Sequence, residues 1–85
     1  MEHIQLKQSI AISESGFIFH PGSGESFSVN ETGLEILELL KKGLSSEDIL
    51  NSLTDNYEVE RTELEKYFFD FISMLKQYHL IRDND

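Results

Sequence analysis

The sequence predicts an α+β fold in which a three-stranded antiparallel meander precedes three helices. Two observations lead to this prediction: apolar residues alternate with period two before Asn30, and they recur at helical spacing after it. Turn-forming residues are concentrated in the first part, whereas helix-forming residues dominate the second. The 85 residues, of which 39% are hydrophobic, are enough for one domain over residues 1–85 with one modest core.

Three strands are expected within about residues 4–29. The first is predicted from apolar residues of one parity, which suit a strand with one buried face: Ile4, Leu6, Ile10 and Ile12. Residues 17–19 form the second strand. The densest cluster of turn formers, residues 20–24, should then reverse the chain into a third strand at residues 26–29, with Phe27 and Val29 on one face.

Three helices are expected within about residues 31–78. Asn30 has the chemistry of an N-cap, and Gly43 ends the first helix. Ser45 begins a sequence like a capping box for the second helix. The third helix runs over residues 61–78, and residues 79–81 return as a short terminal strand or an extended tail. The buried stripe of the third helix is predicted to be Leu64, Phe68, Phe71, Ile72 and Leu75.

Charge and composition exclude several classes of function. Sixteen acidic residues against seven basic ones give a net charge of -9, which works against binding to nucleic acid or to anionic membranes. Cysteine is absent, so disulfides, thiolate metal sites and cysteine nucleophiles are excluded. The first residues do not form a basic region followed by an apolar run, and no apolar stretch is long enough to span a bilayer. We therefore expect a soluble, cytoplasmic protein.

The residue types that catalysis or metal binding requires do not form recognisable patterns. His3, His20 and His79 are not spaced to share a helix face, as a metal-binding pair would be. The serines suit caps and turns, and none lies in a nucleophile-elbow pattern. Residues 22–24 lack the lysine of a phosphate-binding loop. We therefore expect a protein that is not an enzyme and that holds no metal or cofactor.

The third helix carries more apolar residues than one buried stripe requires. Tyr67, Met74 and Tyr78, together with Phe71, form a second strip about 80° from the main axis of burial. This strip is either additional core or an adaptable apolar wall that receives a partner segment.

The third strand also indicates binding, because it contains no lysine or proline that would block pairing at the edge of a sheet. A guest peptide could add a strand there and place alternate side chains against the third helix. The predicted peptide-binding residues are Ser26, Phe27, Ser28, Val29, Tyr67, Phe71, Met74 and Tyr78.

Four segments stand in a recognisable order and spacing: residues 27–33, residues 36–40 followed by Gly43, residues 45–50 followed by residues 57–59, and residues 71–75 followed by residues 80–81. With the order of elements, these segments resemble the PqqD-like family, the RiPP recognition elements that bind leader peptides. The resemblance covers about residues 16–81. Tyr67 stands where the family often has an acidic residue, Val29 where leucine is usual, and His79 where glycine is usual.

The resemblance implies a winged helix-turn-helix-like domain without catalysis of its own. Such a domain holds the leader of a ribosomally made precursor peptide and delivers it to a modifying enzyme, often a radical S-adenosylmethionine enzyme. In this family the leader pairs as an added strand, which here implies pairing with residues 26–29 and packing against Tyr67, Phe71 and Met74.

Two other functions stay open at this point. The same surface could belong to a protein-interaction subunit with a different partner. A winged-helix DNA-binding protein could have the same architecture, since a fold does not determine a function. Charge disfavours DNA binding, because residues 45–60 contain no lysine or arginine and acidic residues balance the basic ones of the third helix.

Overall fold

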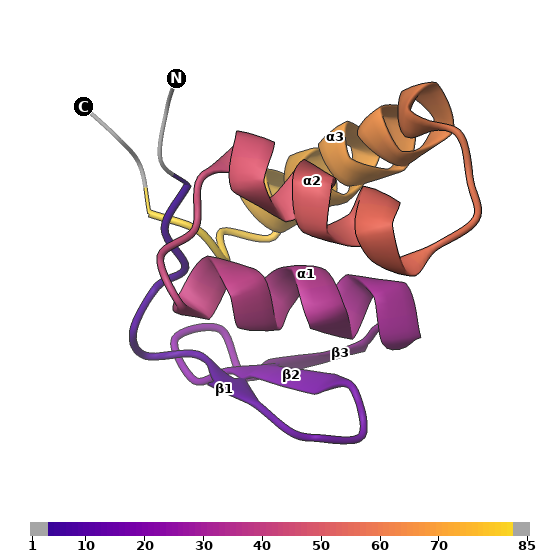
Figure 1. The fold of residues 1–85 in the computed structure, drawn as a ribbon. Helices are drawn as coiled ribbons and strands as arrows, with labels where there is room; N and C mark the ends of the chain where they lie inside the picture. Colours follow the sequence, from indigo (N-terminus) through magenta and orange to yellow (C-terminus); the bar gives the residue numbers. More distant parts are fainter. Residues whose placement is uncertain (1–3, 83–85) are drawn as a thin grey trace.

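The computed structural model describes residues 4–82 and contains three strands followed by three helices (Figure 1). The fold class is therefore α+β, as the sequence predicts. The strands are β1 (Ala11–Ile12), β2 (Phe17–His20) and β3 (Glu25–Ser28). The helices are α1 (Glu31–Lys41), α2 (Ser46–Asn56) and α3 (Arg61–Gln77).

The sheet is antiparallel with the order β1-β2-β3, so β2 is central and β3 is an edge. The predicted turn between β2 and β3 is confirmed, since the Gly24 N–H donates to the His20 carbonyl at 2.8 Å. Ile18 is fully buried on the face toward the helices. Phe17 and Phe19 lie on the opposite face and are 57% and 44% exposed. One face of the sheet thus packs on the core, while the other carries two exposed aromatic rings.

The first strand is shorter than predicted, and the prediction of a strand from about residue 4 is wrong. β1 alone pairs with β2, whereas Leu6 forms an isolated antiparallel bridge with Ile81. The Lys7 N–H also donates to the Leu80 carbonyl at 3.0 Å. Apolar residues at every second position fit one strand, but they fit equally well two extended segments that pack against different partners. Of the two expectations for residues 79–81, a short strand or an extended tail, the structure contains only this isolated bridge at Ile81 and no terminal strand among the described residues.

Local signals begin and end the helices where the sequence predicts. The Asn30 side chain accepts a hydrogen bond from the Gly33 N–H at 2.9 Å, and the Ser45 side chain accepts one from the Asp48 N–H at 3.2 Å. Gly43 follows α1 with a φ of +86°, a left-handed conformation that a residue without Cβ adopts without strain.

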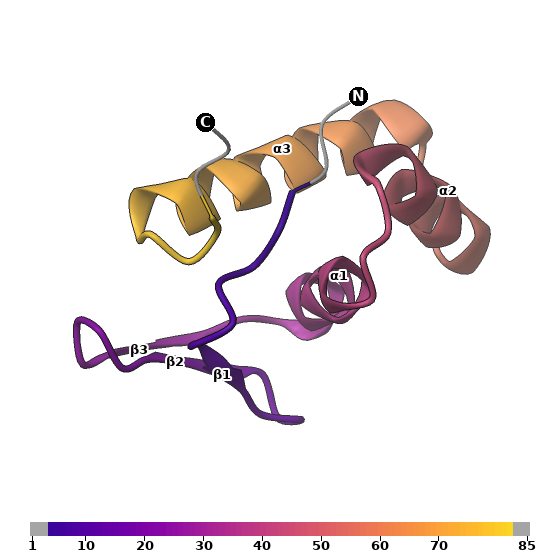
Figure 2. The ribbon, with the colours of Figure 1, turned by 90° about the vertical axis from the view of Figure 1, so that its left-hand side faces the viewer.

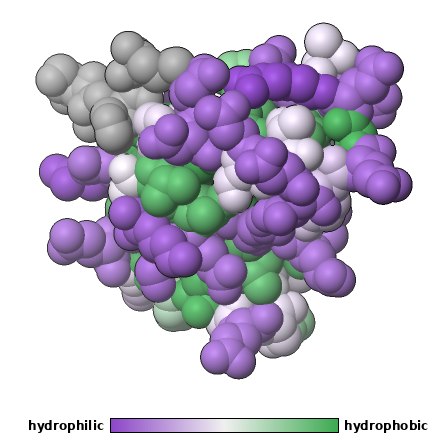
Figure 3. Space-filling model, viewed as in Figure 1, coloured by the Kyte–Doolittle hydropathy of each residue, from purple (hydrophilic) through white to green (hydrophobic). Residues whose placement is uncertain are grey.

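The core lies between the inner face of the sheet and the three helices. In Figures 1 and 2, α3 crosses above the sheet, and α1 lies between the sheet and α2. The predicted stripe of α3 is confirmed as buried, including Phe68, which is inaccessible to solvent. Hydrophilic residues cover most of the face drawn in Figure 3, with hydrophobic residues visible between them. Within residues 4–82, no helix combines the length and apolarity needed to cross a membrane.

The end of α3 places a residue with a side chain in a conformation that suits glycine. The Leu80 N–H donates to the Leu75 carbonyl at 2.9 Å, and the His79 N–H donates to the Lys76 carbonyl at 3.1 Å. These two bonds form a Schellman motif. His79 has a φ of +60°, which costs a residue with a Cβ atom roughly 1–2 kcal/mol. Glycine, which has no Cβ atom, adopts this conformation without that cost.

Replacing His79 with glycine should therefore stabilise the protein. We expect His79→Gly to raise the free energy of unfolding by about 0.5–1 kcal/mol, because the strain removed exceeds the added entropy of the unfolded chain. Chemical denaturation measures this change. The control is Lys76→Gly, within α3, which should lower stability by about 0.5–1 kcal/mol. A loss of stability in both variants would contradict the assignment of strain to His79.

Candidate functional site

β3 presents a free main-chain edge. The Val29 N–H donates to the Gly16 carbonyl at 2.8 Å, so the main-chain groups of Val29 point toward β2. In an antiparallel ladder this direction alternates from residue to residue. The N–H and C=O groups of Ser26 and Ser28 therefore point away from β2. Among the described residues, no strand pairs with this side of β3.

The side chains of β3 alternate as the sequence predicts. Phe27 and Val29 are half-buried and pack against the core, whereas Ser26 and Ser28 are exposed on the outer face. A peptide paired with β3 would follow the same alternation. Half of its side chains would then face the helices, and the other half would face outward.

The second apolar strip of α3 is partly core and partly accessible. Phe71 is 8% exposed and belongs to the buried cluster. Tyr67 and Met74 are half-buried and pack against that cluster, while Tyr78 at the end of the helix is 36% exposed. Phe71 is therefore part of the core, while Tyr67, Met74 and Tyr78 lie at its margin, and their role as a wall for a partner segment stays a prediction.

β3 and α3 approach each other closely enough for their side chains to meet. The ring centroids of Phe27 and Tyr78 lie 4.6 Å apart, and the rings of Tyr67 and Phe71 stack at 6.2 Å. The structure thus brings Phe27 of β3 into contact with Tyr78 at the end of α3. We call the eight predicted residues on these two elements the β3–α3 face. It consists of Ser26, Phe27, Ser28, Val29, Tyr67, Phe71, Met74 and Tyr78.

Two residues that shape this face were not predicted as part of it. Asn30 Oδ1 accepts hydrogen bonds from both the Gly33 N–H and the Tyr67 hydroxyl, each at 2.9 Å. Gly33 is buried, and a Cβ atom there would lie 2.9 Å from Cε1 of Phe71. The sequence signal for Gly33 was a glycine inside a helix, which often marks a close approach. Asn30 was predicted as a cap, but its bond to Tyr67 joins residues far apart in sequence.

The described residues include no group of three or more His, Asp or Glu side chains that could hold a metal ion. His20 lies at the hairpin, where its Nδ1 accepts a hydrogen bond from the Gly22 N–H at 3.2 Å. His79 forms the end of α3, and His3 lies outside the described residues. The histidines that the sequence singled out are thus engaged in local structure where the structure describes them.

Two cavities lie away from the β3–α3 face. The first, of about 380 Å³, is bounded by the N-terminal segment, the end of α1 and Arg82. The second, of about 430 Å³, is lined by residues of α1, Lys42 and Tyr57. Neither cavity includes a residue of the β3–α3 face. That face is therefore a strand edge beside a wall of apolar side chains and is not part of either cavity.

Comparison with known families gives a match over most of the chain. Residues 16–81 match the family described as "Coenzyme PQQ synthesis protein D (PqqD)". The chain belongs to the PqqD family. A search of curated proteins found no match.

Two solved structures share the fold over nearly the whole chain. "Lasso peptide synthetase B1 complexed with the leader peptide" is 28% identical, with a TM-score of 0.85, and the match covers 96% of this chain and 100% of that chain. "TbiB1 in Complex with the TbiA(beta) Leader Peptide" is 23% identical, with a TM-score of 0.85, and the match covers 95% of this chain and 98% of that chain.

Proposed function

We propose that the protein is a non-catalytic peptide chaperone that binds the leader of a ribosomally synthesised precursor peptide and presents it to a modifying enzyme. The observation that carries this proposal is the free edge of β3 beside the apolar side chains of α3. Strand addition to such an edge is a general mode of peptide recognition. Membership of the PqqD family and the likeness to a synthetase component complexed with a leader peptide support it.

In this mechanism the leader forms a fourth strand next to β3. Its main chain exchanges hydrogen bonds with Ser26 and Ser28, each with a net value of about 0.5–1.5 kcal/mol. Main-chain bonds do not depend on the identity of the guest residues. The free edge therefore supplies affinity that tolerates variation in the leader sequence.

Side-chain selectivity comes from α3. The Tyr67–Asn30 hydrogen bond and the Phe27–Tyr78 ring contact lie toward opposite ends of the β3–α3 face. Met74 lies between Tyr67 and Tyr78 along the helix, and its flexible thioether adapts to different apolar side chains. The net charge of -9 favours leaders that carry basic residues.

The second partner in this proposal is the modifying enzyme, for which the resemblance implies a radical S-adenosylmethionine enzyme. The chaperone contributes no reacting group and holds no cofactor. It works in the cytoplasm, where precursor peptides are synthesised on ribosomes.

A proline at position 28 tests the main-chain pairing. Ser28→Pro removes the N–H that points to the free edge, a place where edge strands tolerate proline. We expect the affinity for the leader of a precursor peptide encoded beside this gene to fall at least about tenfold. Fluorescence anisotropy with the labelled leader measures it, and circular dichroism checks folding. Ser28→Ala keeps the N–H and should change the affinity less than about twofold. Equal losses in the two folded variants would contradict strand addition.

A charge on the α3 wall tests the side-chain contacts. Met74→Glu places a carboxylate among apolar groups that the bound leader would cover, so the leader affinity should fall more than about tenfold. The matched control is Phe69→Glu on the same helix, because Phe69 is 55% exposed and lies outside the β3–α3 face. It should change the affinity less than about twofold. If Met74→Glu binds the leader as tightly as the unchanged protein, the α3 wall takes no part in binding.

A further inference from the structure

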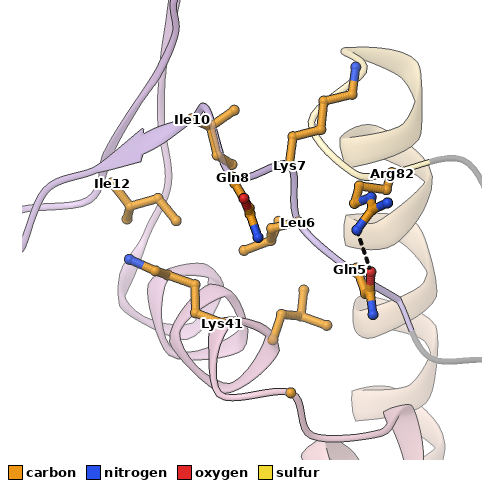
Figure 4. A pocket seen from close by; sticks show the side chains of 10 residues that line it. Gln5, Leu6, Lys7, Gln8, Ile10, Ile12, Lys41 and Arg82 are labelled. Carbon is orange, nitrogen blue, oxygen red and sulfur yellow. Dashed lines mark hydrogen bonds between the residues drawn. The ribbon is translucent and has the colours of Figure 1, made fainter.

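The cavity of about 380 Å³ lies on the β1 side of the sheet (Figure 4). The N-terminal segment and β1 form one wall, and the end of α1 forms another. Because the strand order is β1-β2-β3, the central strand separates this cavity from the free edge of β3. A ligand in the cavity and a leader on β3 would therefore not compete for the same groups.

The lining of this cavity is cationic, although the chain is acidic. Three of the seven basic residues line it, namely Lys7, Lys41 and Arg82. No acidic residue among residues 4–82 lines it. The two ion pairs within that range both use Arg61. Figure 4 shows Lys41 and Arg82 on opposite sides of the cavity and Lys7 extending outward from its rim. Charge complementarity therefore favours an anionic ligand.

The remaining lining groups suit a peptide. Gln5 and Gln8 contribute primary amides, which donate to and accept from main-chain groups, and Gln5 Oε1 already accepts a hydrogen bond from Arg82 at 3.1 Å. The volume lies within the roughly 300–1,000 Å³ of ligand sites. The apolar part of the lining consists of Leu6, Ile10, Ile12 and Leu40.

We propose that this surface, which we call the cationic cavity, binds a peptide segment of the modifying enzyme in which carboxylate and leucine-like side chains stand next to each other. The apolar lining takes the leucine-like side chain, and Lys41 and Arg82 take the carboxylates. The inference rests on the proposed function, because a chaperone that presents a leader has to hold its enzyme while β3 is occupied.

The end of α1 offers a matched pair of lysines for a test. Lys41 lines the cationic cavity, whereas the adjacent Lys42 lines the second cavity together with Glu31, Glu35 and Glu38. Lys41→Glu and Lys42→Glu change the net charge equally and at the same helix end. A difference between their effects therefore reports the cavity itself and not the overall charge.

The probe is an acetylated and amidated hexapeptide of alternating glutamate and leucine, titrated into labelled protein and followed by amide NMR. Shifts are expected in residues 5–12, residues 40–43 and Arg82. Lys41→Glu should weaken binding at least about fivefold and Lys42→Glu less than about twofold. Added salt should weaken binding, since it screens the local attraction. If repulsion between the negative net charges of the protein and the peptide dominated instead, added salt would strengthen binding.

Several results would overturn the proposal. Equal losses in the two lysine variants would show that the cavity is not used. Equal binding of a glutamine-for-glutamate version would exclude recognition of carboxylates. Tighter binding of octanoate would assign the cavity to small amphiphilic anions, and concentration-dependent shifts without peptide would assign it to a second copy of the chain.

A titration of the same samples with the leader, followed at the amide signals of β3, separates this proposal from the proposed function. If only the leader fails to bind, the proposed function is overturned. If only the hexapeptide fails to bind, the assignment of the cationic cavity is overturned.

Discussion

The position of the β3–α3 face depends on one side-chain oxygen, Asn30 Oδ1. Asn30 lies two residues after the end of β3, and its Oδ1 accepts hydrogen bonds from the Gly33 N–H of α1 and from the Tyr67 hydroxyl of α3, both at 2.9 Å. The first of these bonds is an N-cap, which typically contributes about 1 kcal/mol. The second joins α3 to the segment between β3 and α1 and adds to the packing of the buried α3 residues against the core. A single residue thus links the free edge to the helix that would cover a bound peptide.

Close packing at Gly33 supports the same arrangement. Because this position lacks a side chain, the Phe71 ring packs directly over the start of α1. Phe71 is thereby held in the core, while Tyr67 and Met74 remain at its margin. One helix thus contributes both buried core residues and half-buried apolar residues at the margin of the core. The strand edge contributes main-chain N–H and C=O groups, whose hydrogen bonds depend on direction, whereas apolar contacts do not.

Much of the fold could be predicted from the sequence because the signals are local. The caps at Asn30 and Ser45 and the glycine after α1 act within one helical turn, and they lie where the sequence indicates. The first strand was predicted wrongly because Leu6 pairs with Ile81, a contact that no local pattern encodes. In the same way, α3 residues were predicted to lie near β3, but the Tyr67–Asn30 bond and the cationic cavity were not. Each of these depends on segments that only the folded chain brings together.

In the proposed mode of binding, a peptide pairs with the outward main-chain groups of β3. Amide hydrogen exchange, measured with and without the leader of a precursor peptide encoded beside this gene, reports on this pairing residue by residue. The N–H groups of Ser26 and Ser28 should exchange readily in the free protein and at least about tenfold more slowly in the complex. Those of Phe27 and Val29 should be protected in both states, because they already point toward β2. Binding of the leader without new protection at Ser26 and Ser28 would contradict the claim.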